Sequence, residues 1–417
     1  MLALAPFAVP AADFSYSGYG TLGGALSDRG YTYQRFIDNR GTLKRDSVAG
    51  VQVDAKFFDT VGATVQARLA PALASDNRYE ASIAWAFVTW RPSNDWLFRA
   101  GKQRIPLYLY SQNYDVGATY DFARLPTEMY SLVPNNDALS VSVTKTWATP
   151  AGEFVLDGYW GKTKNDLRSW RRDDIPGVQR SGAQFTEFDF TGGGIALAYK
   201  SQEQLFRIGV HRVDVERHDG LALASNYPFV ALAPGVGYYQ VDPALPGPGL
   251  TTVPRVSNTA VTFGAELGLP AQFRVVAEFA RNWAPRTDFA PKGTRGYVAL
   301  LRRFDRWTPY VTYASLRSTS APLNLYAAVN DNRVPVSVPG ALLLNASQRA
   351  GADQIFASDQ RSLAIGSSYS LSAKSKFKAE LMRSHIGTVS YLVDAPSGTD
   401  IRNQDITVLS LSYSFVF

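Results

Sequence analysis

One stretch that has no strand or helix periodicity, residues 101–136, carries charged side chains of both signs. Its carboxylates are Asp115, Asp121 and Glu128, and its guanidinium groups are Arg104 and Arg124. Opposite charges that face each other across a narrow passage create a transverse field, which favours polar solutes over apolar ones. Rows of one sign also bias which ions pass. The stretch therefore predicts electrostatic selection of ions and polar solutes.

Other reactive constellations are poor. The chain has no Cys, and its three His residues, His211, His218 and His385, are too scattered for a metal site or a catalytic triad. The Asn and Asp residues at 330–332 and 135–137 are of a kind that usually serves turns, although their oxygens could bind Ca²⁺. Gly192 to Gly194 lacks the strand–helix context of a phosphate-binding loop and predicts a bulge or kink within its strand. We expect no enzyme activity and no cofactor.

The stretch is also rich in tyrosine, including Tyr108, Tyr110, Tyr114 and Tyr120. A connection of this length is normally either functional or disordered, and aromatic residues argue against disorder. It needs a rigid frame to hold its charges in place. The segments on either side of it predict that frame.

From Asp13 onward the sequence alternates apolar with polar or small residues in segments of roughly ten. In one example Val51, Val53 and Ala55 share a face, and Gln52 and Asp54 share the other. Such lengths exceed those of most soluble strands and suit tilted strands that span a membrane. We predict sixteen strands, at 13–24, 46–57, 60–70, 81–91, 95–101, 138–148, 152–162, 185–200, 203–215, 258–269, 272–283, 293–304, 308–318, 360–371, 375–385 and 404–417.

The connections between these strands alternate in length. Tight turns follow the even-numbered strands, and mostly long connections follow the odd-numbered ones, at 25–45, 71–80, 102–137, 163–184, 216–257, 284–292, 319–359 and 386–403. Outer-membrane barrels have short periplasmic turns and longer extracellular loops, whereas a soluble sandwich has no reason for this segregation. The fold class predicted is an all-β transmembrane antiparallel barrel of sixteen strands.

Aromatic residues lie beside the short turns, as in the interfacial girdles of barrels. They are Phe57, Phe58, Trp90, Trp96, Trp147 and Trp307. The last segment alternates as well, with Ser410, Ser412 and Ser414 on its other face. Its apolar face comprises Leu409, Leu411, Tyr413, Phe415 and Phe417.

The composition sets further bounds. The chain has 417 residues and a net charge of +6, which is too small over this length to argue for a nucleic-acid partner. No window is apolar enough for a transmembrane helix. Residues 1–12 read as the remnant of a secretory signal or as an unstructured apolar tail, and residues 13–417 as a single barrel.

The strand number, the long connection after the fifth strand and the terminal Phe417 resemble the general porins of Gram-negative outer membranes. The resemblance implies that the connection at about 102–137 folds into the lumen as a constriction loop and that three chains form a homotrimer. It also implies that the face ending in Phe417 is the signal that the outer-membrane assembly machinery reads. The sequence lacks the family's Pro-Glu-Phe-Gly-Gly loop motif and has residues 115–117 and 124–130 instead.

Alternation places a further set of basic residues on the lumen side of the strands. They are Arg68, Arg99, Arg207, Arg274, Lys376 and Lys378, with His211 at the same parity. We predict that Asp115, Asp121 and Glu128 lie inside the barrel and face Arg68 and Arg99. Of these, Arg68, Arg99, Asp115 and Asp121 are predicted to act together near the constriction. Basic candidates outnumber acidic ones, which favours a weak preference for anions.

We therefore expect a passive, water-filled channel for small hydrophilic solutes and ions, surrounded by outer-membrane lipid and lipopolysaccharide. One alternative is a substrate-specific channel, for small organic acids or similar solutes, whose loop 216–257 or 319–359 hides a further hairpin to give eighteen strands. The apolar run at 341–345 is the candidate for that hairpin. An outer-membrane lipase and a soluble β-sandwich adhesin are the remaining alternatives.

Overall fold

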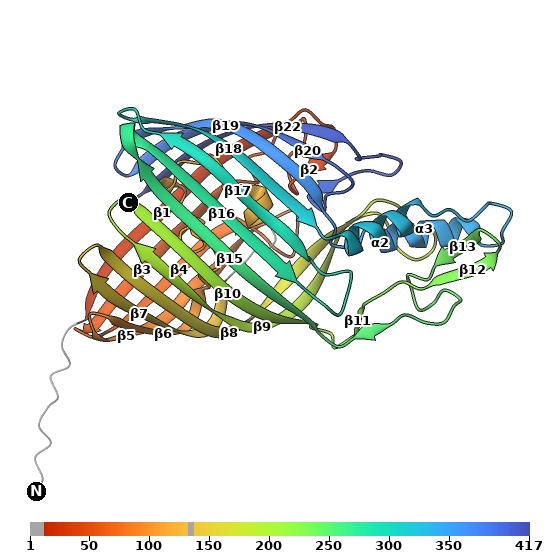
Figure 1. Ribbon diagram of the computed structural model, residues 1–417, viewed down its shortest axis with the longest axis horizontal. Coiled ribbons are helices and arrows are strands. Elements are labelled where there is room, and N and C mark those ends of the chain that lie inside the picture. The colour runs from red at the N-terminus through yellow and green to blue at the C-terminus, as the bar shows by residue number, and fades with distance from the viewer. Residues whose placement is uncertain (1–11, 132–136) are drawn as a thin grey trace, which may run out of the picture.

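In a computed structural model, which describes residues 12–131 and 137–417, sixteen strands form one closed antiparallel barrel (Figure 1). Its strands are β1 (Asp13–Ser27), β3 (Val48–Phe58), β4 (Val61–Pro71), β5 (Tyr79–Ser93), β6 (Trp96–Arg104), β7 (Asp137–Thr149), β8 (Gly152–Arg171), β9 (Gly182–Lys200), β10 (Gln204–Arg217), β15 (Val256–Leu269), β16 (Phe273–Trp283), β17 (Gly293–Arg302), β18 (Trp307–Ser318), β19 (Asp359–Ser372), β20 (Ser375–Ile386) and β22 (Gln404–Val416). Each of the sixteen predicted strands corresponds to one of these. None of the described helices is both long and apolar enough to cross a membrane.

Every barrel strand pairs with its neighbours along the chain, and β1 closes the barrel against β22 with Tyr19 opposite Val416. Backbone hydrogen bonds continue this closure, since Gly18 and Phe417 exchange N–H···O bonds of 3.1 and 3.0 Å. A closed sheet leaves no unpaired edge, which is the condition for strands to span lipid.

The predicted alternation decides which side chains face the lumen. In β20, Phe377 and Leu381 are 51% and 55% exposed on the outer surface, whereas Lys378 and Glu380 are buried inside. All six aromatic residues predicted beside the short turns are exposed. Leu409, Leu411, Phe415 and Phe417 are likewise exposed on the outer face of the last strand, and their part in assembly stays a prediction.

The prediction for the connection 163–184 was wrong in extent. Strand β8 continues to Arg171 and β9 begins at Gly182, so only residues 172–181 join them. The additional residues of the two strands are paired throughout, with Leu167 opposite Thr186. Residues 163–171 have polar side chains on both faces, with Leu167 on one and Trp170 on the other, and therefore show no apolar period that reveals a strand. The predicted bulge at Gly192 to Gly194 is also absent, because β9 keeps its register through both neighbours.

The eighteen-strand alternative is contradicted as well. The connection 319–358 contains helices α2 (Ser320–Asp331) and α3 (Ala341–Ala352), so the apolar run at 341–345 begins a helix. The connection 218–255 forms small two-stranded sheets outside the barrel, β11 (Leu223–Ala224) with β14 (Thr252–Val253) and β12 (Phe229–Ala233) with β13 (Val236–Tyr239). These elements project from the end of the barrel opposite the C-terminus (Figure 1). Of the predicted signal remnant, residues 1–11 lie outside the described chain.

Candidate functional site

The connection between β6 and β7 packs against the inner wall of the barrel. It contains a 3₁₀ turn, η1 (Gly117–Thr119), and a short helix, α1 (Thr127–Tyr130). Its apolar side chains form a buried cluster with inward-facing residues of β16, β17 and β18. The loop contributes Tyr108, Tyr110, Phe122, Leu125, Met129 and Tyr130, and the wall contributes Val276, Ala280, Tyr297, Ala299, Leu301, Tyr310 and Ala314. An apolar core inside the lumen therefore fixes the path of this loop.

Buried carboxylates of the wall anchor the same loop. Glu278 accepts hydrogen bonds from the Tyr130 hydroxyl and, at 2.9 Å, from the backbone N–H of Leu109. Glu266 accepts one from the hydroxyl of Tyr110 at 2.7 Å. Sequence alternation places both glutamates on the lumen face, but nothing in the sequence indicated that they hold the loop.

Asp115 is the centre of the first charged cluster. Its carboxylate lies 2.7 Å from Arg104 and 3.2 Å from Arg68, and all three side chains are largely buried. Arg104 also binds Asp137 at 2.8 Å. Burial alone would raise the pKa of Asp115, but Arg104 and Arg68 hold it below its usual range. Asp115 is thus a fixed negative charge.

Asp121 forms a second cluster with later strands. It accepts hydrogen bonds from Lys376 at 2.8 Å, Arg274 at 2.6 Å and the Ser368 hydroxyl at 2.8 Å. Here too burial would raise the pKa, and the nearby Lys376 and Arg274 lower it below the usual value. Since those cations come from β16 and β20, the loop contacts widely separated parts of the wall.

Two more predicted residues, Arg124 and Lys378, form contacts through the same loop. Arg124 pairs with Asp46 of the first long connection, through hydrogen bonds that include one of 2.7 Å. Lys378 donates to the backbone carbonyl of Gly117 and lies 4.2 Å from the centre of the Tyr120 ring.

Glu128 and Arg99 differ from expectation. Glu128 is fully buried and accepts a hydrogen bond from Gln360 at 2.8 Å, instead of facing Arg68 or Arg99. Arg99 lies 5.7 Å from the ring of Phe87, and none of the described loop residues forms an ion pair with it. Asp115 pairs with Arg68, whereas Asp121 pairs with Arg274 and Lys376, and the joint action of Arg68, Arg99, Asp115 and Asp121 near the constriction stays a prediction. Parity gives the face of a side chain but not its height in the barrel.

Arg207 is held by another partner that the sequence did not single out. It lies 3.5 Å from Asp157 and donates to the carbonyl of Pro106 at the start of the loop. His211 is buried on the lumen side, where its ring bonds to Tyr159 at 2.9 Å and Thr262 at 3.2 Å. Within the described residues, no group of three or more His, Asp or Glu side chains is placed to hold a metal ion.

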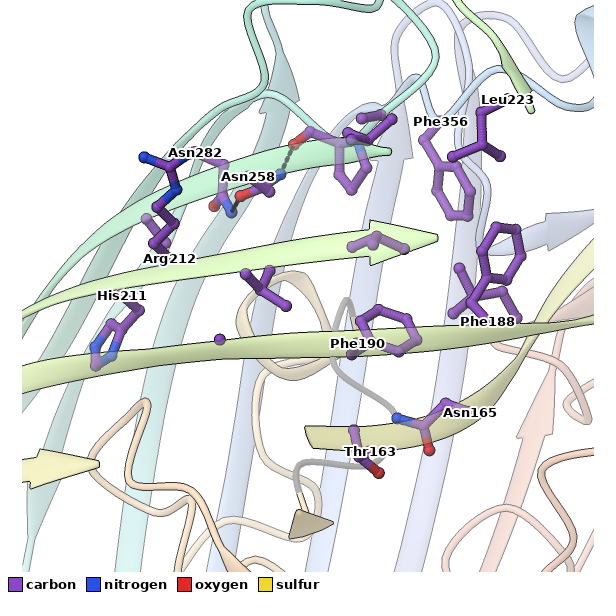
Figure 2. A pocket seen from close by; sticks show the side chains of 18 of the residues that line it. Thr163, Asn165, Phe188, Phe190, His211, Arg212, Leu223, Asn258, Asn282 and Phe356 are labelled. Carbon is purple, nitrogen blue, oxygen red and sulfur yellow. Dashed lines mark hydrogen bonds between the residues drawn. The ribbon is translucent and has the colours of Figure 1, made fainter. Parts of the chain in front are cut away.

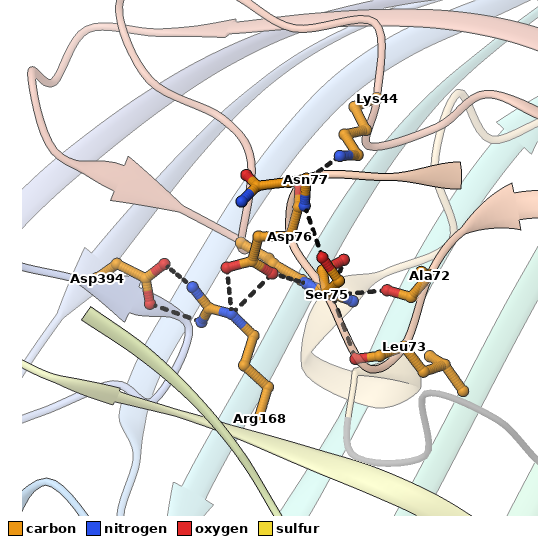
Figure 3. Close-up of polar contacts among 9 residues, drawn as sticks. Lys44, Ala72, Leu73, Ser75, Asp76, Asn77, Arg168 and Asp394 are labelled. Atoms are coloured by element: carbon orange, nitrogen blue, oxygen red, sulfur yellow. Dashed lines mark hydrogen bonds and ion pairs between the residues drawn. The ribbon is translucent and has the colours of Figure 1, made fainter. Parts of the chain in front are cut away.

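Arginine pairs tie the long connections together at the mouth (Figure 3). Arg168 of β8 lies between Asp76, at 2.9 Å, and Asp394, at 2.5 Å. Asp76 also binds Arg35 of the first long connection. Asp394 belongs to β21 (Val393–Asp394), so one aspartate and one arginine link four separate segments.

A cavity of about 280 Å³ lies beside Asp115 and Arg124. Its charged lining is mostly basic, with Arg35, Arg45, Arg68, Arg124, Arg168 and Lys378 against Asp46, Asp115 and Asp166. The Nε atoms of Arg45 and Arg68 are buried without a hydrogen-bond partner. This lining can attract small anions.

No protein-family model and no curated protein matches the sequence. Solved structures do match it over nearly the whole chain. A loop-deletion variant of OmpT, an outer membrane protein of Vibrio cholerae, has a TM-score of 0.53 at 10% identity and covers 98% of this chain and 100% of its own. OprB of Pseudomonas putida has a TM-score of 0.53 at 11% identity, covering 97% and 94%. The anion-selective porin of Comamonas acidovorans has a TM-score of 0.51 at 8% identity, covering 97% and 100%.

These likenesses, together with the closed barrel of sixteen strands, define the class of fold. The chain has the fold of the Gram-negative outer-membrane porins. The expected resemblance is confirmed at the level of the fold.

Proposed function

We propose that the protein is a passive diffusion channel of the outer membrane for small hydrophilic solutes and ions. The observation that carries this proposal is the charged loop inside the barrel, which presents Asp115 to Arg68 and Asp121 to Lys376. Fixed charges of both signs around an aqueous path suit polar solutes, and they need neither turnover nor a cofactor. We assign this role to the charged residues of the loop and of the wall near it, with Arg99 acting on the wall apart from the loop. They are Arg68, Arg99, Arg104, Asp115, Asp121, Arg124 and Glu128.

A weak anion preference is part of the proposal. It is supported by the basic excess around the cavity beside Asp115 and by the unpartnered nitrogen atoms of Arg45 and Arg68. Arg207, Arg274, Lys376 and Lys378 contribute to the wall, although each also bonds to a carboxylate or a carbonyl group.

Single-channel recording in planar bilayers tests both statements. We expect stable ohmic conductance in KCl and, in a KCl gradient, a reversal potential of the sign for anion preference. A protein that gives no conductance would overturn the channel, whereas a clear cation preference would overturn only the selectivity. Liposome swelling with sugars of graded size adds the expected smooth size cutoff.

The oligomer proposed is a homotrimer embedded in lipid and lipopolysaccharide. Exposed apolar residues such as Val51, Ile195 and Leu381 surround the barrel and supply the surface for lipid or a neighbouring copy. Analytical ultracentrifugation in detergent tests the trimer, because a monomeric mass would contradict it.

A further inference from the structure

A second and larger cavity of about 450 Å³ opens on the lumen side of β8, β9, β10 and β15 (Figure 2). This volume lies in the range of sites for small organic ligands. Porin lumens are ordinarily polar, but this wall is not. Phe188, Phe190, Val213 and Val215 line it from the strands.

The register explains the apolar wall. Val215 lies opposite Phe190 on one side and Val256 on the other, so these side chains share the lumen face. Glycines hollow the wall next to them, because Gly161 and Gly192 lie opposite each other in β8 and β9. Loop residues complete the enclosure, including Leu223, Phe289 and Phe356.

Arg295 is the most deeply buried of the charged residues at this largely apolar cavity, which Lys162, Arg168, Arg212 and Arg217 also line. Arg295 of β17 lines the cavity and is only 4% exposed, and its Nε and Nη1 atoms have no hydrogen-bond partner. Among the described residues, no carboxylate forms an ion pair with Arg295, and none of those that line the cavity is Asp or Glu. A buried guanidinium without a counter-charge is costly, and a bound anion would remove that cost.

Neighbouring amides hold this arginine in position. Its Nη2 donates to Asn282 at 2.9 Å, Asn282 donates to Asn258 at 2.8 Å, and Asn258 donates to the carbonyl of Pro291 at 3.0 Å. The last two bonds are drawn in Figure 2. Tyr108 belongs to the connection between β6 and β7, which we call the lumen loop, and lies against the other side of Arg295. The guanidinium carbon of Arg295 is 5.6 Å from the centre of the Tyr108 ring. The Nη2 atom of Arg295 is thus used within the chain, whereas its Nε and Nη1 atoms have no hydrogen-bond partner.

We propose that this cavity binds organic monoanions with an aromatic or aliphatic body, such as aryl carboxylates, on their way through the channel. The carboxylate accepts a charge-assisted hydrogen bond from an unpartnered nitrogen of Arg295, and the body packs against Phe188, Phe190 and the loop aromatics. Arginine is suited to a carboxylate because its guanidinium group stays charged and forms strong charge-assisted hydrogen bonds. This inference rests on the proposed channel function, and it names a class of solute that the cavity binds.

The test is block of the KCl current by 3-phenylpropionate in bilayers that contain the full-length protein. We expect reversible block, with half-blocking concentrations at least about tenfold higher for acetate, which lacks the body, and for 3-phenylpropanol, which lacks the charge. Equal block by all three probes, or no block, would overturn the site. The unblocked conductance reports on the channel separately, so the two proposals fail in different ways.

Variants locate the site. Arg295→Gln should raise the half-blocking concentration of 3-phenylpropionate about tenfold or more. Arg281→Gln removes the same charge from an exposed residue of the adjacent strand, opposite Thr294, and should leave block unchanged. If the Arg295→Gln variant does not assemble, Arg295→Lys and Phe190→Ala test the site in its place. Each should weaken block by 3-phenylpropionate, and wild-type block in both would contradict the assignment.

Discussion

The carboxylate of Asp121 lies 2.8 Å from the ammonium group of Lys376, although 255 positions separate the two residues in the chain. The pair joins the lumen loop to β20, while Arg274 binds the same carboxylate from β16. One negative charge therefore offsets two positive charges at the wall. Its removal should change which ions the channel prefers.

Asp121→Asn should increase anion preference. Two unit charges about 4 Å apart interact by about 1 kcal/mol in water, so the anion-to-cation permeability ratio should rise by up to about fivefold. The measurement is the reversal potential in a KCl gradient. Asp59→Asn is the matched control, because that side chain is 97% exposed in a short turn. An unchanged ratio in Asp121→Asn would show that the path does not pass this cluster.

Acidification should neutralise Asp115 and Asp121 only at low pH. The pKa values of Asp115 and Asp121 are held below 3.8 by the arginines and the lysine beside them. For carboxylates whose folded pKa is lowered, the stabilisation is full above the unfolded value and is lost as the pH falls through the folded value.

The contribution of Asp115 and Asp121 to selectivity should therefore stay constant from pH 7 down to about 4, and selectivity should shift toward anions below that, as these two carboxylates become protonated. Reversal potentials measured at a series of pH values test this. The double variant Asp115→Asn, Asp121→Asn should already show the low-pH preference at pH 7 and lose the transition. A shift between pH 5 and 7 would assign the effect to other groups.

Arg104→Gln should destabilise the barrel. This arginine is almost completely buried between Asp115 and Asp137, and its loss leaves those carboxylates with one cation fewer. Removing one partner from a buried ion pair costs about 3 kcal/mol or more. Urea unfolding in lipid vesicles, followed by tryptophan fluorescence, measures the change. Arg91→Gln, at an exposed site in β5, should unfold like the wild type.

The sequence predicted the barrel well because lipid imposes a period. Val51 and Val53 had to alternate with Gln52 and Asp54, and a turn had to follow each membrane-spanning strand. The number of strands and the face of each side chain could therefore be predicted without knowledge of any contact. Segments beyond the lipid carry no such constraint. Residues 163–171 extend β8 with polar side chains on both faces, and 341–352 form a helix where an extra hairpin was considered.

The site was predicted only in part, for a related reason. Parity correctly placed Arg68 and Lys376 in the lumen, but the identity of each partner depends on the three-dimensional path of the loop. That path is fixed by Glu278 and by an apolar cluster around Phe122, which no local pattern reveals. Arg295 was missed because it is an isolated basic residue in a regular strand, and its lack of a partner is visible only in space.

Asp76→Asn should loosen the mouth of the barrel. Asp76 binds Arg35 and Arg168, and Arg168 also binds Asp394, so the substitution weakens the link between four segments (Figure 3). These pairs are mostly buried, and the loss of about 1.4 kcal/mol would change a loop equilibrium about tenfold. Released segments can then fall into the aqueous path, which we expect to raise the frequency of spontaneous closures about tenfold in single-channel records.

The control is Asp400→Asn, which removes an aspartate that pairs with Arg402 at a 65% exposed site and should gate like the wild type. Equal gating in both variants would show that the arginine links do not hold the mouth open.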